Sequence, residues 1–259
     1  MQIVVNADDF GLSSDTVRAT IAAIRAGRVT SATLMPGAPA CAEAIAFARA
    51  TPAASFGVHL TFAGEGSGRS IAPRKEVPAL VGPMGQLYRS TNRVRLLAIL
   101  GRLPVSELER EIEAQLDWVR GHGIDVSHVD SHQHLHKYKP FRDALARVLP
   151  RLGLRRVRNV QDIYLHRPHF GPTALFGSRW YRELTTQFAT TDHFYMPAST
   201  GDTSWTALLS MPELHDSTIE IGIHPGEDEL WRRLEAQGSA EFAHEAMSGG
   251  HRLVTWREI

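Results

Sequence analysis

The stretch MQIVVNADDF, residues 1–10, sets the pattern from which the fold can be predicted. A largely apolar, β-branched run covers residues 3–7, which is typical of a strand buried in a parallel sheet. Two acidic residues, Asp8 and Asp9, follow directly, and a helical pattern begins a few residues later. A buried strand, polar residues at its end and a helix together make one β/α unit.

The same unit recurs along the chain. Further strands are expected at residues 29–35, 55–62, 126–131, 155–160, 193–197, 218–223 and 252–256. No repeat or low-complexity linker divides the chain, and serial alternation of strands and helices favours one parallel sheet. Seven or eight such units favour closure into a barrel, so we predict a single α/β domain over residues 1–259 with about seven strands. An open doubly wound sheet is the alternative.

The connections between the strands carry further signals. Helices are expected over residues 14–26 with Gly27 as the stop, over 41–50, after a capping box of Ser106 and Glu109, and over about 140–149. Residues 63 to about 90 are rich in Gly, Pro and Ser and are too long for a simple connector, so we expect an active-site loop there. The Gly-rich GEGSG lies in this loop rather than after the first strand, which gives little support to a dinucleotide site.

Composition excludes several classes of protein. Lys and Arg together number 28, as do Asp and Glu, so charge gives no case for a nucleic-acid or anionic-membrane partner. Cys41 is the only cysteine, which rules out an internal disulfide. No run of 18 or more apolar residues is present, so no membrane span is expected and a cytoplasmic protein is the default.

Polar side chains gather at the ends of the expected strands. In a parallel barrel all these ends open on one face, where active sites are built. We therefore expect groups that are distant in the sequence to converge there: Asp8 and Asp9, His59, the run HVDSHQHLH at 128–136, Arg158, His193 and His224.

One carboxylate and two imidazoles form a suitable three-ligand set for a divalent ion, which activates water and polarises a carbonyl. A second carboxylate can accept a proton and a separate histidine can protonate a leaving group. These parts suit hydrolysis of an amide or ester without a covalent nucleophile. Within the run, His128 is expected to belong to the scaffold. At least one of His132, His134 and His136 is expected to be a ligand, but not all three, because they share a face only while the backbone stays extended.

The segments VVNADDFGLS, GVHLTF, HVDSHQHLH and IGIHPG together resemble the YdjC-like carbohydrate deacetylases, over nearly the whole chain and in the same order. That family includes chitooligosaccharide deacetylase and the deacetylase associated with hopanoid biosynthesis. The resemblance implies a deformed (β/α) barrel related to the polysaccharide deacetylases and an N-acetylated sugar as substrate. It implies Asp9, His59 and His132 as ligands of one divalent ion, Asp8 as general base and His224 as general acid.

The resulting prediction is a metal-dependent hydrolase that removes an acetyl group from an N-acetylated amino sugar and releases acetate. The alternatives are another metal-dependent amidohydrolase or phosphoesterase on a barrel, or a catalytically idle sugar-binding homologue. Mg²⁺ or Zn²⁺ is the expected ion, and the ligand set also suits Mn²⁺, Co²⁺ or Ni²⁺. His134, His136 and Arg158 are expected to contact the substrate or to support the ligands. A homodimer would be unsurprising, and the sugar's identity is left open.

Overall fold

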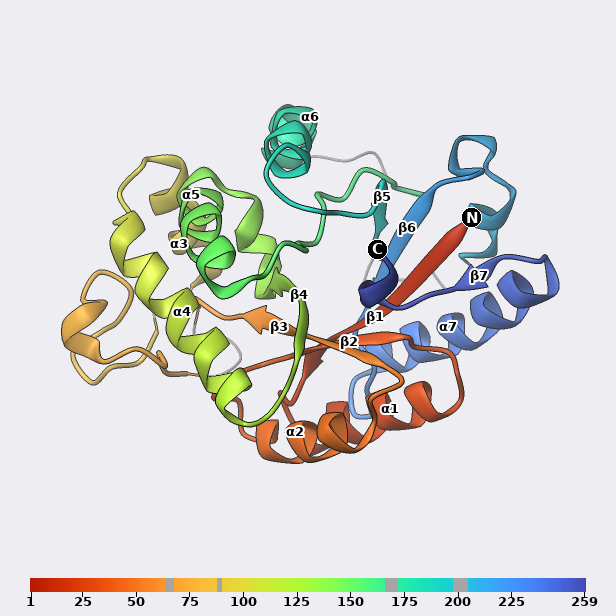
Figure 1. Ribbon diagram of the computed structural model, residues 1–259, viewed down its shortest axis with the longest axis horizontal. Helices are drawn as coiled ribbons and strands as arrows, with labels where there is room; N and C mark the ends of the chain where they lie inside the picture. The colour runs from red at the N-terminus through yellow and green to blue at the C-terminus, as the bar shows by residue number, and fades with distance from the viewer. Residues whose placement is uncertain (64–67, 88–89, 166–171, 198–204) are drawn as a thin grey trace.

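The computed structural model describes residues 1–63, 68–87, 90–165, 172–197 and 205–259. Within these residues, seven strands lie at the centre of the molecule and helices surround them (Figure 1). The strands are β1 (Gln2–Phe10), β2 (Ser31–Leu34), β3 (Ser55–Leu60), β4 (Val126–Ser131), β5 (His193–Tyr195), β6 (Thr218–Ile223) and β7 (Arg252–Leu253).

The sheet is parallel and follows the order β4-β3-β2-β1-β6-β5. Isolated parallel bridges join the two edges of the sheet through the segment 157–163. Val129 of β4 pairs with Val157, and Ile163 pairs with Tyr195 of β5. From β1 to β6 the strands therefore follow one another around the sheet in sequence order, with β6 again beside β1, as in a barrel and unlike an open doubly wound sheet, while β7 pairs with β1. The predicted deformed α/β barrel is confirmed, with one side joined only by these single bridges.

Strand β1 is the centre of this sheet. Every residue from Ile3 to Phe10 is buried, and the strand pairs with β6 along one edge. On the other edge β7 pairs with residues 2–3 and β2 with residues 6–10. Burial on both faces explains the largely apolar run at residues 3–7, since neither face of the strand meets water.

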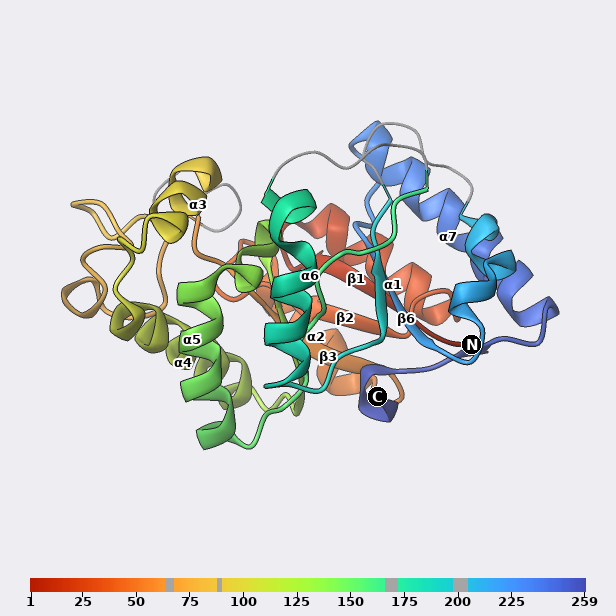
Figure 2. The same ribbon diagram turned by 90° about the horizontal axis from the view of Figure 1, so that it is seen from above.

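The helices lie outside the strands, with α1, α2 and α7 on one side and α3, α4 and α5 at one end (Figures 1 and 2). Ser13 caps the first helix in a capping box with Thr16, and Gly27 follows its end with a φ of 69°. The helices are α1 (Ser14–Arg25), α2 (Cys41–Ala50), α3 (Thr91–Ile99), α4 (Val105–Gly121), α5 (Lys139–Val148), α6 (Pro172–Thr185) and α7 (Leu230–Ser248).

Two local predictions were wrong. Residues 155–160 form only single bridges rather than a strand, so this side of the barrel is irregular. The expected capping box of Ser106 and Glu109 is absent because α4 begins at Val105 after Pro104, which places Ser106 inside the first turn. The amides of Glu107 and Leu108 both donate to the Pro104 carbonyl, so the first turn closes without a side-chain cap.

The segment from 63 to about 90 holds little regular structure. Residues 64–67 and 88–89 of this expected active-site loop lie outside the described residues. The described part contains one 3₁₀ turn, Arg74–Glu76, and packs on α4 through Glu111, whose carboxylate accepts hydrogen bonds from the Ile71 and Ala72 amides. Buried carboxylate acceptors of this kind fix a loop that lacks its own ladder of hydrogen bonds.

The C-terminal residues cover the end of the barrel at which the strands begin. The Trp256 amide donates to the hydroxyl groups of Ser31 and Ser55, the first residues of β2 and β3. Its ring stacks on His128 with a centroid distance of 4.7 Å. His128 is fully buried and bonded to Asn6 and Ser127, so it belongs to the packed interior of the barrel.

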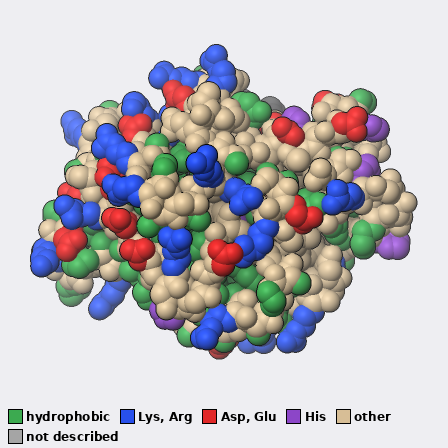
Figure 3. All heavy atoms as spheres, viewed as in Figure 1, with side chains coloured by type: hydrophobic (Ala, Val, Ile, Leu, Met, Phe, Trp, Pro, Cys, Tyr) green, Lys and Arg blue, Asp and Glu red, His purple; other side chains and the backbone are tan. Residues whose placement is uncertain are grey.

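The surface agrees with the balanced composition. Basic and acidic side chains are interspersed over the face in Figure 3, so its described residues form no broad surface of one sign. None of the helices within the described residues combines the length and the apolar character that crossing a bilayer requires.

Gly57 of β3 gives a test of the packing inside the barrel. A Cβ atom there would lie 2.6 Å from both Cε1 and the carbonyl oxygen of His128. We expect Gly57→Ala to lower the free energy of unfolding by about 1–3 kcal/mol, because a buried backbone atom cannot move aside cheaply. Denaturant unfolding measures the change. Gly121→Ala is the matched control, since its Cβ would meet nothing within 4 Å in α4, and equal effects of the two changes would contradict the prediction.

Candidate active site

The two aspartates at the end of β1 point to different partners because the backbone turns between them. Asp9 has a φ of 57°, in the left-handed region that non-glycine residues rarely adopt, and the pairing of β1 with β2 shifts register between Ala7 and Phe10. The Asp9 carbonyl accepts hydrogen bonds from the Leu12 amide and the Thr16 hydroxyl, which hold this turn. Asp8 consequently reaches the barrel interior while Asp9 faces the histidines.

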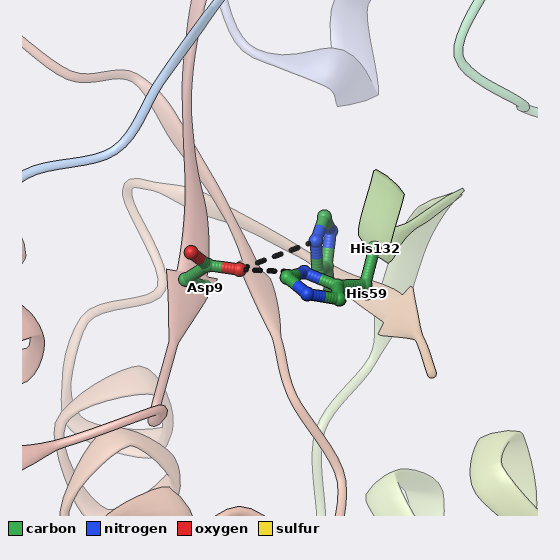
Figure 4. A group of neighbouring side chains, drawn as sticks. All are labelled: Asp9, His59 and His132. Atoms are coloured by element: carbon green, nitrogen blue, oxygen red, sulfur yellow. Dashed lines mark hydrogen bonds and ion pairs between the residues drawn. The ribbon is translucent and has the colours of Figure 1, made fainter. Parts of the chain in front are cut away.

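Asp9, His59 and His132 come together from the ends of β1, β3 and β4 (Figure 4). Oδ1 of Asp9 lies 3.2 Å from Nδ1 of His132 and 3.5 Å from Nε2 of His59. Ligand atoms that share one ion at about 2.1 Å are about 3.0–3.4 Å apart, so these spacings suit a common ion. One oxygen and two imidazole nitrogens form the donor set that was predicted, and the group is compatible with a divalent metal ion.

Asp130 fixes the orientation of His59. Its Oδ1 lies 2.7 Å from Nδ1 of His59, and its Oδ2 accepts from Thr33 and Arg158. A proton on Nδ1 leaves Nε2 with a free lone pair toward Asp9, as a ligand requires. Burial opposes a charge on the ring, but the Asp130 carboxylate raises the pKa of His59 above its usual value.

Asp8 is held by a fully buried guanidinium. Arg158 donates from Nη1 to Oδ2 and from Nη2 to Oδ1 of Asp8, each at 2.6 Å, and Asn6 donates to Oδ1. Burial alone would raise the pKa of Asp8, but the charge and hydrogen bonds of Arg158 hold it well below its usual range. Asp8 is therefore ionised and fixed in a bidentate pair.

The same guanidinium binds two more carboxylates. Arg158 contacts Asp130 at 2.9 Å and Glu220 at 2.7 Å, and burial raises the pKa of Glu220 to about 7 despite this contact. Asp8, His59 and Asp130 are the other group of possible ligands within the described residues. Both of its carboxylates already bind Arg158, whose charge opposes a second cation at that position.

His224 directly follows β6 and lies near Asp8. The Glu235 carboxylate, from α7, lies 3.1 Å from Nδ1 of His224 and accepts a hydrogen bond from the His224 backbone amide at 2.7 Å. Nε2 of His224 lies 3.9 Å from Oδ2 of Asp8. Burial disfavours the charged ring, but Glu235, with Asp9 and Asp8, raises the pKa of His224 to about 9. The ring is thus protonated at neutral pH. Trp231 packs against it with a centroid distance of 5.3 Å.

His134 and His136 lie apart from the group of Asp9, His59 and His132. After Ser131 the extended strand ends, and the 3₁₀ segment His132–Lys137 contains φ angles of 58° at Gln133 and 54° at His134. Nδ1 of His136 bonds the Ser131 hydroxyl, and Nε2 of His134 lies 3.3 Å from the Met196 sulfur. Burial lowers the pKa of both rings well below the usual value, so both are neutral.

The expected convergence on one rim was wrong for His193. This residue pairs with Ile219 near the start of β6, at the end of the barrel opposite to His224. Its Nδ1 lies 2.8 Å from Oδ2 of Asp162. Because His193 is the first residue of the short strand β5 rather than the last, its side chain cannot face the same rim.

Three residues that touch the site were not singled out from the sequence: Asp130, Arg232 and Glu235. Asp130 carried a usable signal, because alternate residues of an extended strand share a face and Asp130 precedes His132 by two positions. Arg232 and Glu235 lie in an ordinary charged pattern at the start of α7. Nothing in that pattern distinguishes them from solvent-exposed helix residues.

The fold and the site define an α/β barrel protein with a buried carboxylate–imidazole centre at the ends of its strands. The chain matches the family model described as YdjC-like protein over residues 2–253, and it belongs to that family.

Relatives with assigned names support this placement. A carbohydrate deacetylase from Geobacillus stearothermophilus is 30% identical over 263 residues, which cover 99% of this chain and 97% of that protein. A chitooligosaccharide deacetylase from Enterobacter sp. (strain 638) is 27% identical over 267 residues, covering 99% and 98%. A carbohydrate deacetylase from Halalkalibacterium halodurans is 35% identical over 154 residues, which cover 60% of this chain and 62% of that protein.

Solved structures of similar fold include a proposed cellobiose-phosphate cleavage protein from Enterococcus faecalis, with a TM-score of 0.77 and 23% identity over 99% of this chain and 98% of that one. A lactam utilization protein from Thermus thermophilus has a TM-score of 0.57 and 12% identity, covering 98% and 100%. At these identities the likeness concerns the fold alone.

Asp130 provides a test of how the ligands are held. We expect Asp130→Asn to weaken binding of Zn²⁺ or Co²⁺ by about 10–100-fold, because an amide cannot accept from both His59 and Arg158 and the His59 ring loses its fixed tautomer. Titration of metal-free protein against a chromophoric chelator measures the Kd. Asp125→Asn is the control, because that carboxylate is 81% exposed and pairs with Arg257 on the surface. An unchanged Kd in the Asp130 variant would show that Asp130 does not hold His59 for metal binding.

Proposed function

We propose that this protein hydrolyses the acetamide of an N-acetylated amino sugar, releasing acetate and a free amine. The observation that carries the proposal is the placement of a three-ligand group, Asp9, His59 and His132, beside a separate ionised carboxylate and a separate protonated imidazole. Relatives named carbohydrate deacetylase and chitooligosaccharide deacetylase, aligned over nearly the whole chain, support the same chemistry.

Asp9, His59 and His132 would hold one divalent ion. When bound, such an ion lowers the pKa of a coordinated water and polarises the acyl oxygen. The donor set suits Zn²⁺ and also Mg²⁺, Mn²⁺, Co²⁺ or Ni²⁺, and Mg²⁺ or Zn²⁺ remains our preferred assignment. His59 keeps its lone pair available because Asp130 holds the proton of its other nitrogen.

Asp8 acts as the general base in this proposal. Both of its oxygens accept from Arg158, and Oδ1 also accepts from Asn6, so Oδ2, on the side of His224 and with one donor fewer, is the oxygen that accepts the proton of the attacking water. Arg158 orients the carboxylate and keeps it ionised at neutral pH. A base that is ionised before substrate arrives needs no separate deprotonation step.

His224 acts as the general acid. Its Nδ1 faces Glu235, so Nε2 carries the proton that is given to the departing nitrogen. The ring is partly exposed, at 19%, and can therefore meet a substrate entering from the rim of the barrel. Asp8 and His224 face each other, so the proton taken from water and the proton given to nitrogen are handled within one site.

His134 and His136 are proposed to line the substrate side of the centre. Nδ1 of His134 is buried without a hydrogen-bond partner among the described residues, so it can bond a sugar hydroxyl. We also propose that the chain is one domain and that the described part of the segment 63–90 forms part of the sugar pocket, because Ile71 lies against Gly37 just beyond the end of β2. The homodimer and the cytoplasmic location stay predictions.

The alternatives receive less support. A phosphoesterase with two ions needs a second ligand group, and Arg158 occupies the other group among the described residues. A catalytically idle binding protein has no use for an imidazole that is held protonated beside an ionised carboxylate.

Mass spectrometry of a panel of N-acetylated mono- and oligosaccharides tests the function directly. We expect the metal-loaded protein to remove one acetyl group from at least one member and to lose this activity when the ion is stripped. Asp8→Asn should abolish turnover, because the amide cannot accept the proton, while leaving the metal Kd nearly unchanged. Full activity of protein that metal analysis shows to be stripped would refute metal dependence. Full activity of the Asp8 variant would refute the base assignment.

The pH dependence tests the partnership of His224 and Glu235. A general acid must be protonated, so activity falls as the pH rises through the pKa of His224. Glu235 raises that pKa, so Glu235→Gln should move the alkaline limb of the kcat/KM profile to lower pH and reduce activity most strongly above neutrality. Glu241→Gln, on an exposed position of the same helix, is the control. A limb that stays in place or moves upward would exclude His224 as the acid.

A further inference from the structure

Arg232 is a buried arginine on the first turn of α7, where it binds the proposed metal carboxylate. It is 5% exposed, and its Nη2 donates to Oδ2 of Asp9 at 2.9 Å. Its Nε donates to Glu229 at 2.8 Å, while its Nη1 has no hydrogen-bond partner in the part of the chain that the structure describes. The guanidinium therefore gives Asp9 a single hydrogen bond, unlike the bidentate pair between Arg158 and Asp8.

The two oxygens of Asp9 are thus divided between two kinds of partner. Oδ1 faces His132 and His59, and Oδ2 faces Arg232. Rotation of the carboxylate that brought both oxygens toward the histidines would break the hydrogen bond to Arg232. The geometry leaves one oxygen of Asp9 for an ion.

The position of Arg232 is built into the loop before the helix. A Cβ atom at Gly226 would lie 2.7 Å from Cδ of Arg232, so only glycine allows the side chain to pass. Oδ2 of Asp15 holds this loop by accepting hydrogen bonds from the backbone amides of Glu227 and Asp228. The ring of Trp231 lies 4.4 Å from the guanidinium carbon and covers it further.

The charge of Arg232 has opposite effects in the two states of the centre. A carboxylate as buried as Asp9 is costly unless a cation is paired with it, and Arg232 is the only Lys or Arg that pairs with it among the described residues. Without an ion, Arg232 therefore stabilises the carboxylate in place. With an ion at Oδ1, the same positive charge repels it at short range.

We propose that Arg232 is the counter-charge of the metal centre. Its guanidinium keeps the buried Asp9 carboxylate in place when no ion is bound, limits Asp9 to one ligand oxygen and weakens the binding of the ion. This inference rests on the proposed function, since it takes Asp9, His59 and His132 as the ligands. Arg232 is a positioning residue that acts through Asp9. Its consequence is an ion that exchanges readily while the site keeps its shape.

Metal binding to the full chain, measured by competition with a chromophoric chelator, tests the proposal. We expect Arg232→Met, which keeps the length of the side chain and removes its charge, to bind Zn²⁺ about fivefold or more tightly than the wild type. The metal-free variant should melt at a lower temperature than the metal-free wild type, because Asp9 is left buried without a cation. Arg232→Lys keeps the charge and should stay within about threefold of the wild-type Kd.

Two further variants keep the test decisive. Arg233→Met is the matched control, because Arg233 is next to Arg232 in the sequence, is exposed and donates to the Glu227 carbonyl rather than to a ligand of the centre. Glu229 is 56% exposed, so Glu229→Gln should fold normally, and it should raise the Kd about twofold or more because Arg232 then shares its charge with Asp9 alone. This second arm decides the question if Arg232→Met does not fold.

The outcomes separate this proposal from the proposed function. Unchanged or weaker Zn²⁺ binding by Arg232→Met, or an unchanged Kd in Glu229→Gln, overturns the role of Arg232. A wild-type chain that binds no ion overturns the metal centre and this inference with it. One bound ion with the expected changes in Kd, but no loss of acetyl groups from any sugar, overturns the deacetylase function and leaves the role of Arg232 standing.

Discussion

The fully buried guanidinium of Arg158 is the interaction on which the rest of the site depends. It binds Asp8 from β1, Asp130 from β4 and Glu220 from β6, and so it ties together strands on both sides of the barrel. Through Asp8 it fixes the proposed base, and through Asp130 it fixes the orientation of His59. Removing one member of such a network leaves a remaining charge buried with fewer partners, so each single replacement lowers the stability of the fold.

Adjacent aspartates have different surroundings because the backbone gives each its own arginine. Asp8 continues the strand and meets Arg158 in the interior, whereas Asp9 turns through a left-handed conformation and meets Arg232 from α7. Bidentate pairing fixes both oxygens of the first carboxylate, and a single bond leaves one oxygen of the second available. The chemistry of the pair therefore follows from a local backbone feature and from two elements that are far apart in the sequence.

The site residues that lie at the ends of strands could be predicted from the sequence. Near one another in the structure are Asp8, Asp9, His59, His132 and His224, each of which lies within the last three residues of a buried strand or directly after it, so periodicity and parallel topology were enough to predict this. Supporting residues escaped prediction because helix α7 presents Arg232 and Glu235 in a pattern that also suits a solvated face. Residues 155–160 misled for a different reason: this segment, in which Val157 and Val160 stand among arginines, meets its neighbours through single bridges only. Local propensity cannot tell whether a segment finds a partner along its whole length.

The contact of Trp256 with the start of the barrel bears on the order in which the protein forms. Its amide reaches the Ser31 hydroxyl across 225 positions of sequence, and its ring nitrogen donates to Glu220 inside the charged interior. During synthesis the first six strands can emerge and pair, but the buried acids stay open to water at that end until residue 256 has left the ribosome. Contacts of such long range are formed late and slowly. The charged interior is therefore closed to water at that end only once residue 256 is in place, however early the strands have paired.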